Sequence, residues 1–169
     1  MIKIDSQYVV AAQNADDPGE LAYLLQLAMK LEHATIPPYL AAAYSLKSGH
    51  NGDIFNTLKS ISEEEMLHMA LIGNILNAIG QTPIIADKSF IPSYPGPLPL
   101  SIGSGLQVGI EKFSMNLIQN VFMEIEKPET PLHFEVLAQA GDIEFSTIGE
   151  FYIASVSYTH LTLPTICSV

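Results

Sequence analysis

The stretch that decides the fold is residues 54–79, IFNTLKSISEEEMLHMALIGNILNAI. At about 100° per residue, apolar side chains recur on one face of a helix. They are Ile54, Leu58, Ile61, Ile72, Ile75, Leu76 and Ile79. Glu65 and His68 fall within this apolar face, although the opposite face already carries enough polar residues for contact with water. The pattern predicts that Glu65 and His68 point inward, and a buried carboxylate beside an imidazole suggests a metal.

Length and composition indicate one globular domain. The chain has 169 residues, of which 48% are hydrophobic and 15% charged, enough for a sizeable core. The balance is acidic, with a formal net charge of -11 and no arginine. Because such a surface repels phosphate groups, we expect neither nucleic-acid binding nor attraction to an anionic membrane. The partners to consider are a small-molecule substrate and further copies of the chain as a homo-oligomer.

Cysteine usage and the N-terminus point to the cytoplasm. Cys167 is the single cysteine, which excludes a disulfide framework and a metal site built from cysteines. The N-terminal residues lack the apolar core of a signal peptide, and no apolar run approaches the ~18 residues of a membrane span. We therefore expect a cytoplasmic protein without a membrane span.

An earlier helix is predicted to begin at Asp17 and to run to about Tyr44. Asp17 has the character of an N-cap, proline follows at the first helical position, and Glu20 is placed to close a capping box. Pro37 and Pro38 interrupt the helix and lack N–H groups, so carbonyls four residues upstream lose their usual donors. A kink is expected at that point.

The second helix is predicted to begin near residues 51–53 and to end before Gly80. Residues 82–104 carry five prolines and several glycines, so they form a long irregular connection. A four-helix bundle whose second and third helices run parallel needs one crossover of this length. The sequence therefore predicts an all-α four-helix bundle with a long Pro/Gly-rich crossover.

The third helix is predicted to start near Ser114 and to end before Pro128, and the capping box Thr147-x-x-Glu150 opens a fourth. From about Val156 the helical pattern is lost, and we interpret residues 156–169 as a non-native read-through tail. The expected domain is residues 1–155 with its core at about 17–155. The fourth helix is then truncated, as in a gene fragment.

The same helical geometry places a second acidic residue inward. Glu32 falls on the face of Leu21, Leu24, Leu25, Ala28 and Leu31, whereas Lys30 and Lys59 point outward. Each inward glutamate must be protonated, paired with a cation or bound to a metal. A salt bridge is hard to arrange, because the chain has no arginine and these two lysines point outward. Carboxylates with one imidazole suit iron or manganese, as one or two ions.

Two alternatives remain open at this stage. Protonated Glu32 and Glu65 could instead hydrogen-bond to each other, to His68 or to Tyr39 in a purely structural bundle. Periodicity does not choose between Glu124 and Glu126 on the third helix. The methionine-containing stripes, with Met66, Met69, Met115 and Met123, are interpreted as core packing.

Several motifs in a fixed order point to a family. They are LEHATIPPYL (31–40), EEMLHM (64–69), NILNAIG (74–80), YPGPLP (94–99), FMEIEKPE (122–129) and TIGEFY (147–152). Together they resemble the ferritin-like domain associated with iminophenyl-pyruvate dimer synthases of violacein-type and rebeccamycin-type pigment biosynthesis. That family includes enzymes that oxidatively couple two imines derived from tryptophan, and it also includes many stand-alone proteins of unassigned role.

The resemblance implies a set of metal ligands, namely Glu32, Glu65, His68, Glu126 and Glu150. Di-iron bundles place a histidine three residues after the last glutamate, but this chain has Ile153 there. A site with one histidine, or a mononuclear site, is therefore expected. The implied function is a metal-dependent oxidoreductase acting on a small organic substrate. The alternative is a non-catalytic storage bundle, or a partner module of a biosynthetic enzyme.

Overall fold

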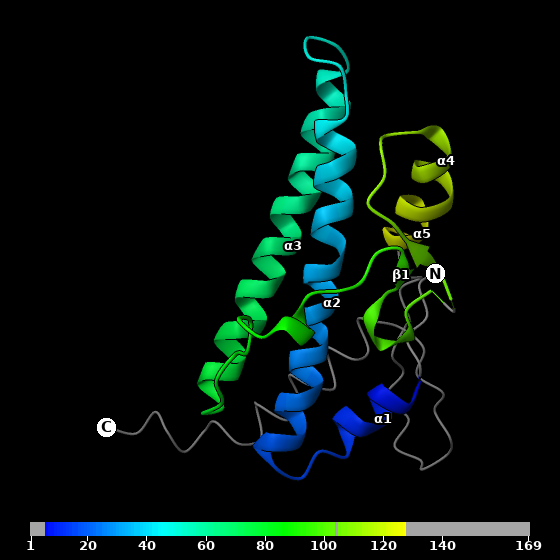
Figure 1. Cartoon of the computed structure of the whole chain (residues 1–169). Helices are drawn as coiled ribbons and strands as arrows, with labels where there is room; N and C mark the ends of the chain where they lie inside the picture. The colour runs from blue at the N-terminus through cyan, green and yellow to red at the C-terminus, as the bar shows by residue number, and fades with distance from the viewer. Residues whose placement is uncertain (1–5, 104, 128–169) are drawn as a thin grey trace, which may run out of the picture.

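The computed structural model describes residues 6–103 and 105–127 and is mostly helical (Figure 1). Among its helices, none is both long enough and apolar enough to cross a bilayer. Glu150, the predicted fourth helix and the predicted read-through tail fall outside the described residues. The elements are α1 (Ser6–Gln13), α2 (Pro18–Tyr44), α3 (Gly52–Ala78), η1 (Lys88–Phe90), β1 (Gly96–Pro97), η2 (Pro99–Ser101), β2 (Gln107–Val108), α4 (Met115–Leu117), η3 (Ile118–Phe122) and α5 (Met123–Ile125).

The centre of the fold is the hairpin of α2 and α3, two 27-residue helices that pack side by side along their length (Figure 1). The predicted stripe of α2 is buried in full. On α3, Leu58, Ile72 and Leu76 are buried as predicted, whereas Ile54 is exposed. The helical period of the sequence therefore identified the contact faces of both arms. This packing is consistent with a ferritin-like helical fold.

Side-chain and backbone caps set where the two arms begin and end. Asp17 caps α2 by accepting hydrogen bonds from the amides of Gly19, at 2.6 Å, and Glu20, at 3.0 Å. The carboxylate of Glu20 accepts from the amide of Asp16, at 3.0 Å, one residue outside the capping box that we predicted. The N-terminal cap of α2 therefore extends one residue further than the sequence pattern suggested.

The C-terminus of α3 is closed by a Schellman motif. Gly80 adopts a positive φ of 75° and its amide donates to the carbonyl of Asn77 at 3.0 Å. The amide of Gln81 donates to the carbonyl of Leu76 at 2.8 Å. Glycine suits this position because a side chain disfavours the left-handed conformation. The predicted end of the second helix is confirmed.

Helix α2 continues through Pro37 and Pro38 to Tyr44. Pro38 cannot donate to the carbonyl of Ala34, four residues upstream. That carbonyl instead accepts a hydrogen bond of 2.7 Å from the hydroxyl of Tyr94, in the crossover. Tyr94 therefore replaces the backbone donor that Pro38 lacks. The kink expected here stays a prediction.

The crossover between α3 and α4 is attached to α2 by hydrogen bonds. The side-chain amide of Gln26 donates to the carbonyl of Ile84 at 2.7 Å and accepts from its amide at 2.9 Å, while Lys30 donates to the carbonyl of Ser89. Gln26 and Lys30 lie opposite the core face of α2. The polar face of this helix is therefore a binding surface for the crossover.

The same segment also contributes to the core and carries a small sheet. Its buried apolar side chains are Phe90, Leu98, Leu100, Ile102 and Val108. β1 and β2 pair antiparallel, with Gly96 opposite Val108 and Pro97 opposite Gln107. The long irregular crossover is confirmed, and this sheet is an addition to the all-α prediction. In Figure 1 the crossover returns along the hairpin, so the α4 to α5 segment runs in the direction of α3.

The third helical segment starts as predicted but is not one regular helix. Ser114 caps α4 by accepting a 3.1 Å hydrogen bond from the amide of Leu117. Residues Ile118–Phe122 then form a π turn, η3, before α5. The prediction of a regular helix here is therefore wrong in its middle. Sequence analysis also missed α1, which packs Val9 and Ala12 against the hairpin core.

Candidate metal centre

Two buried carboxylates face each other across the hairpin. Glu32 lies on α2 and Glu65 on α3, and each residue is only 8% exposed. Both follow the apolar stripe of their helix, so the packing that buries the stripes also brings the two acids together. This part of the site arises directly from the two helical faces.

His68, one helical turn after Glu65, completes a cluster of three. Its Nδ1 lies 3.5 Å from Oε2 of Glu32 and 3.5 Å from Oε2 of Glu65. One ligand atom from each residue can be chosen so that all three lie within 4.8 Å of one another. The His68 side chain is 50% exposed, so the prediction that it points fully inward is wrong. It lies at the edge of the apolar stripe, where the contact between the helices ends.

Burial perturbs the titration of this cluster. Loss of solvation raises the pKa of the Glu65 carboxyl, and the hydrogen bond and negative charge of Glu32 raise it further. A hydrogen bond with Glu32 raises the pKa of His68. Both raised pKa values indicate that the cluster favours an added proton. A proton or another positive charge between Glu32 and Glu65 relieves the repulsion of their carboxylates. A bound cation would do the same.

Glu126 approaches the same region from the end of α5. Its Oε1 accepts a 2.6 Å hydrogen bond from the hydroxyl of Tyr39, which is fully buried on α2. Burial, followed by the charge of Glu126, raises the pKa of Tyr39. The charge of Glu126 also raises the pKa values of Glu65 and His68, which places its carboxylate near the cluster.

Glu124 and Glu126 have different surroundings, although periodicity could not separate them. Glu124 forms an exposed ion pair with Lys127 at 3.3 Å. Glu126 is oriented toward the hairpin by its bond to Tyr39. The π turn explains why the sequence pattern failed, because the five residues of η3 do not follow the 100° step of an α-helix. Of the two carboxylates, Glu126 is the one near the cluster.

The lysines of the hairpin are engaged elsewhere. Lys30 binds the crossover, and Lys59 pairs with Glu63 at 2.8 Å on the exposed side of α3. Glu63 and Glu64 are both exposed. These placements agree with the sequence-based expectation that Lys30 and Lys59 face outward.

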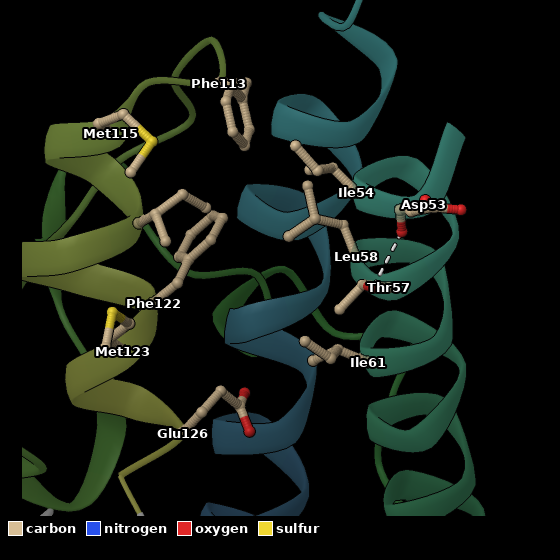
Figure 2. Close-up of a pocket in the computed structure, with 11 residues that line it drawn as sticks. Asp53, Ile54, Thr57, Leu58, Ile61, Phe113, Met115, Phe122, Met123 and Glu126 are labelled. Carbon is tan, nitrogen blue, oxygen red and sulfur yellow. Dashed lines mark hydrogen bonds between the residues drawn. The ribbon is translucent and has the colours of Figure 1, made fainter. Parts of the chain in front are cut away.

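A cavity of about 400 Å³ lies between α3 and the α4–η3–α5 segment and ends at Glu126 (Figure 2). Met115 and Met123 line it and are exposed, and Met66 is also exposed. Our interpretation of these three methionines as core packing is therefore wrong. Sequence analysis did not find this cavity, although the sequence did contain a signal, the cluster of methionine and phenylalanine at 113–123.

The comparison with protein families agrees with this arrangement. The sequence model of the family described as Ferritin-like matches residues 25–165. The chain belongs to the ferritin-like family. The match includes Glu32, Glu65 and His68, which form a possible carboxylate and histidine metal site of this ferritin-like domain. Neither the curated proteins nor the solved structures gave a match to the chain.

Within the ferritin-like domain, the described residues bring together four of the five ligand candidates. Glu32, Glu65 and His68 form the cluster, and Glu126 lies beside it. Glu150 lies outside the described residues. The connection to iminophenyl-pyruvate dimer synthases, made from the motifs, stays a prediction.

Proposed function

We propose that this ferritin-like protein binds iron or manganese and acts as a metal-dependent oxidoreductase on a small organic molecule. Glu32, Glu65 and His68 would hold the metal, with Glu126 and Glu150 completing the ligand set for one or two ions. The observation that carries the proposal is that ligand atoms of two buried carboxylates and one imidazole lie within 4.8 Å of one another.

The chemistry of the donors supports this assignment. Burial inside the hairpin, followed by the hydrogen bond and charge of Glu32, raises the pKa of Glu65, so holding two ionised carboxylates here is costly. A divalent cation offsets the repulsion without the need for protonation. Carboxylate oxygens with a single imidazole nitrogen suit iron or manganese better than a metal that prefers thiolates, and Cys167 is the single cysteine.

The protein's own residues would position and shield the site. The hydroxyl of Tyr39 holds the carboxylate of Glu126 in place through its 2.6 Å hydrogen bond. Glu32 and Glu65 are buried by the hairpin, whereas His68 is half exposed and leaves one side open. Bound iron or manganese would supply redox chemistry toward dioxygen or a peroxide.

A specific observation favours an enzyme over a storage protein. The cavity that ends at Glu126 could hold an organic molecule beside the metal ligands. A non-catalytic storage bundle has no need for such a cavity and would form a large symmetric assembly. Light scattering that finds a monomer or dimer would argue against storage, and a large cage would argue against our proposal.

Metal analysis tests the site. Purified protein is loaded with Fe(II) or Mn(II) without oxygen, desalted, and its metal content is measured. We expect stoichiometric metal in the wild type, and its loss in Glu32→Ala and His68→Ala. Glu63→Ala and His50→Ala are matched controls, because both residues are exposed and Glu63 pairs with Lys59 on the exposed side of α3. A wild type without metal, or equal metal in all five proteins, would contradict the proposal.

Product analysis tests the reaction. The loaded protein is incubated with an amino-acid-derived imine and a peroxide or dioxygen, and coupled or oxidised products are identified by mass spectrometry. Product should require both metal and oxidant and should be lost in His68→Ala. If a fully loaded protein yields no product from a panel of such imines and amines, a non-catalytic role is the better account.

A further inference from the structure

We propose that the cavity between α3 and the α4–η3–α5 segment binds an uncharged, apolar organic molecule with one end next to Glu126. That this molecule is the substrate rests on the proposed function. That the cavity binds it does not, because the argument uses only the lining, the volume and the charge of the cavity.

The lining is almost entirely apolar. Apart from Asp53, Thr57 and Glu126, every residue that lines the cavity has an apolar side chain. These side chains come from both walls, with Ile54 and Ile61 on one side and Phe122 on the other (Figure 2). The hydroxyl of Thr57 donates to the carbonyl of Asp53 at 2.9 Å, so this polar group is already paired. An apolar ligand would gain from leaving water here.

The volume selects a small molecule. About 400 Å³ lies within the roughly 300–1,000 Å³ range of pockets that enclose organic ligands. Exposed apolar side chains on the rim, among them Ile54, Met115 and Met123, are unusual positions for residues that only stabilise a core. Methionine adapts its shape to different ligands, which suits a binding surface. A compound of two or three rings would fit this space.

The charge at the inner end excludes anions. Glu126 lies there, and its negative charge already reaches Glu65 and His68. No lysine is among the lining residues that the structure describes, and the whole chain carries a net charge of -11. A carboxylate or sulfonate on the ligand would therefore meet repulsion without a compensating partner. An uncharged molecule, such as an aromatic amine or the amide of an amino-acid-derived imine, is favoured over the free acid.

Two fluorescent probes with the same ring skeleton test this selection. N-phenyl-1-naphthylamine is uncharged, and 8-anilino-1-naphthalenesulfonate carries one sulfonate on the same rings. We expect the uncharged probe to bind the full, metal-free chain at least about tenfold more tightly than the sulfonate. Glu126→Gln should reduce the ratio of the two probes' dissociation constants. Equal binding of the two probes would overturn the charge selection.

Two tryptophan variants locate the binding site. Ile54→Trp and Met123→Trp place a large side chain in the cavity from opposite walls, at positions exposed enough to tolerate it. Each should weaken binding of the uncharged probe by about tenfold or more. Met66→Trp is the matched control, because Met66 is an exposed methionine of α3 outside the cavity lining. Circular dichroism checks that all three variants fold.

The outcomes separate this inference from the proposed function. If Ile54→Trp, Met123→Trp and Met66→Trp all bind the probe like the wild type, the cavity is not the binding site and the inference fails, whatever the metal content. If the probe is blocked by Ile54→Trp and Met123→Trp but the wild type holds no metal, the proposed function fails and the cavity site stands.

Discussion

The α2·α3 hairpin and the α4–η3–α5 segment differ in regularity and in how far they bury their apolar side chains. Each arm of the hairpin is a regular 27-residue helix that buries its apolar face and one carboxylate. The α4–η3–α5 segment covers only residues 115–125, contains a π turn and leaves Met115 and Met123 exposed on a cavity. The hairpin carries the three residues of the candidate metal site, and the shorter segment contributes the carboxylate of Glu126 and one wall of the cavity.

This difference shows which site residues can be placed from helical periodicity alone. Regular helices bring Glu32 and Glu65 together because their stripes pack, so any disturbance of that packing should be costly. The α4–η3–α5 segment places Glu126 through a single hydrogen bond to Tyr39, so changes on its open side should cost little.

The largest expected effect is a difference in stability loss between a hairpin variant and a variant of the shorter segment. Leu76 is 1% exposed in the hairpin core, and Leu76→Ala should destabilise the protein by about 2–5 kcal/mol through lost burial and a new cavity. Met123 is 59% exposed, and Met123→Ala should change stability by no more than about 0.5 kcal/mol. Urea denaturation followed by circular dichroism measures both. Similar losses in the two variants would remove the distinction between the regions.

A second prediction concerns pH and the buried acids. In the metal-free protein the pKa of Glu65 is raised, so the folded state keeps a proton that the unfolded state, with an ordinary pKa near 4.5, has lost. Stability should therefore fall as pH rises from about 5 to 8, by at most about 1.4 kcal/mol per pH unit for one proton. Urea unfolding with a chelator present measures this slope.

The variant Glu65→Gln should flatten that pH slope because it removes the titrating group. Glu63→Gln is the matched control and should retain the slope, since Glu63 is exposed and pairs with Lys59 rather than with the cluster. A slope that is unchanged in Glu65→Gln would show that other groups govern the pH dependence.

A third prediction tests the link between the two regions. Tyr39→Phe removes the hydroxyl that holds Glu126 and keeps the ring contact with Phe122, whose centroid lies 4.5 Å away. A stability loss of about 1–2 kcal/mol is expected for a hydrogen bond to a charged acceptor. Tyr44→Phe, at an exposed position on the same helix, should have almost no effect. Thermal unfolding of the two variants makes the comparison, and equal melting temperatures would refute the link.

The smallest effect concerns the end of the hairpin. Gly80 has a positive φ, and Gly80→Ala should cost about 1 kcal/mol because a Cβ disfavours that conformation. Gly52, at the other end of α3, has open space around the position of a Cβ, and Gly52→Ala should be neutral or slightly stabilising. Urea midpoints of the two variants measure the difference. Equal losses would mean that the left-handed turn is not what distinguishes these two glycines.

The sequence predicted those parts of the molecule that depend on contacts close in sequence. The faces of α2 and α3, the Asp17 cap and the Gly80 stop each rest on neighbours within a few residues, so Glu32 and Glu65 could be placed inward. His68 was misplaced because a helical angle does not tell where the contact between two helices ends. Its edge position depends on the partner helix.

Other features depend on residues far apart in the chain. The bond from Tyr94 to Ala34 joins residues 60 positions apart, and the bond from Tyr39 to Glu126 joins residues 87 positions apart. No local pattern encodes either. The π turn adds a second obstacle, because it shifts the angular position of every residue after it, including Glu126. The cavity lies between α3 and the segment that contains the π turn, so its lining also combines residues far apart in the chain.

The two prolines of α2 have a consequence for how the crossover aligns along this helix. In a helix with an unbroken series of backbone hydrogen bonds, every turn offers a neighbouring segment the same backbone, so the neighbour could shift by one turn. Pro38 makes one turn different, because the carbonyl of Ala34 is left to accept a hydrogen bond from outside the helix. Tyr94 binds that turn, which lies directly after Glu32. Pro38 therefore fixes the register of the crossover against α2, at the level of the candidate metal ligand Glu32.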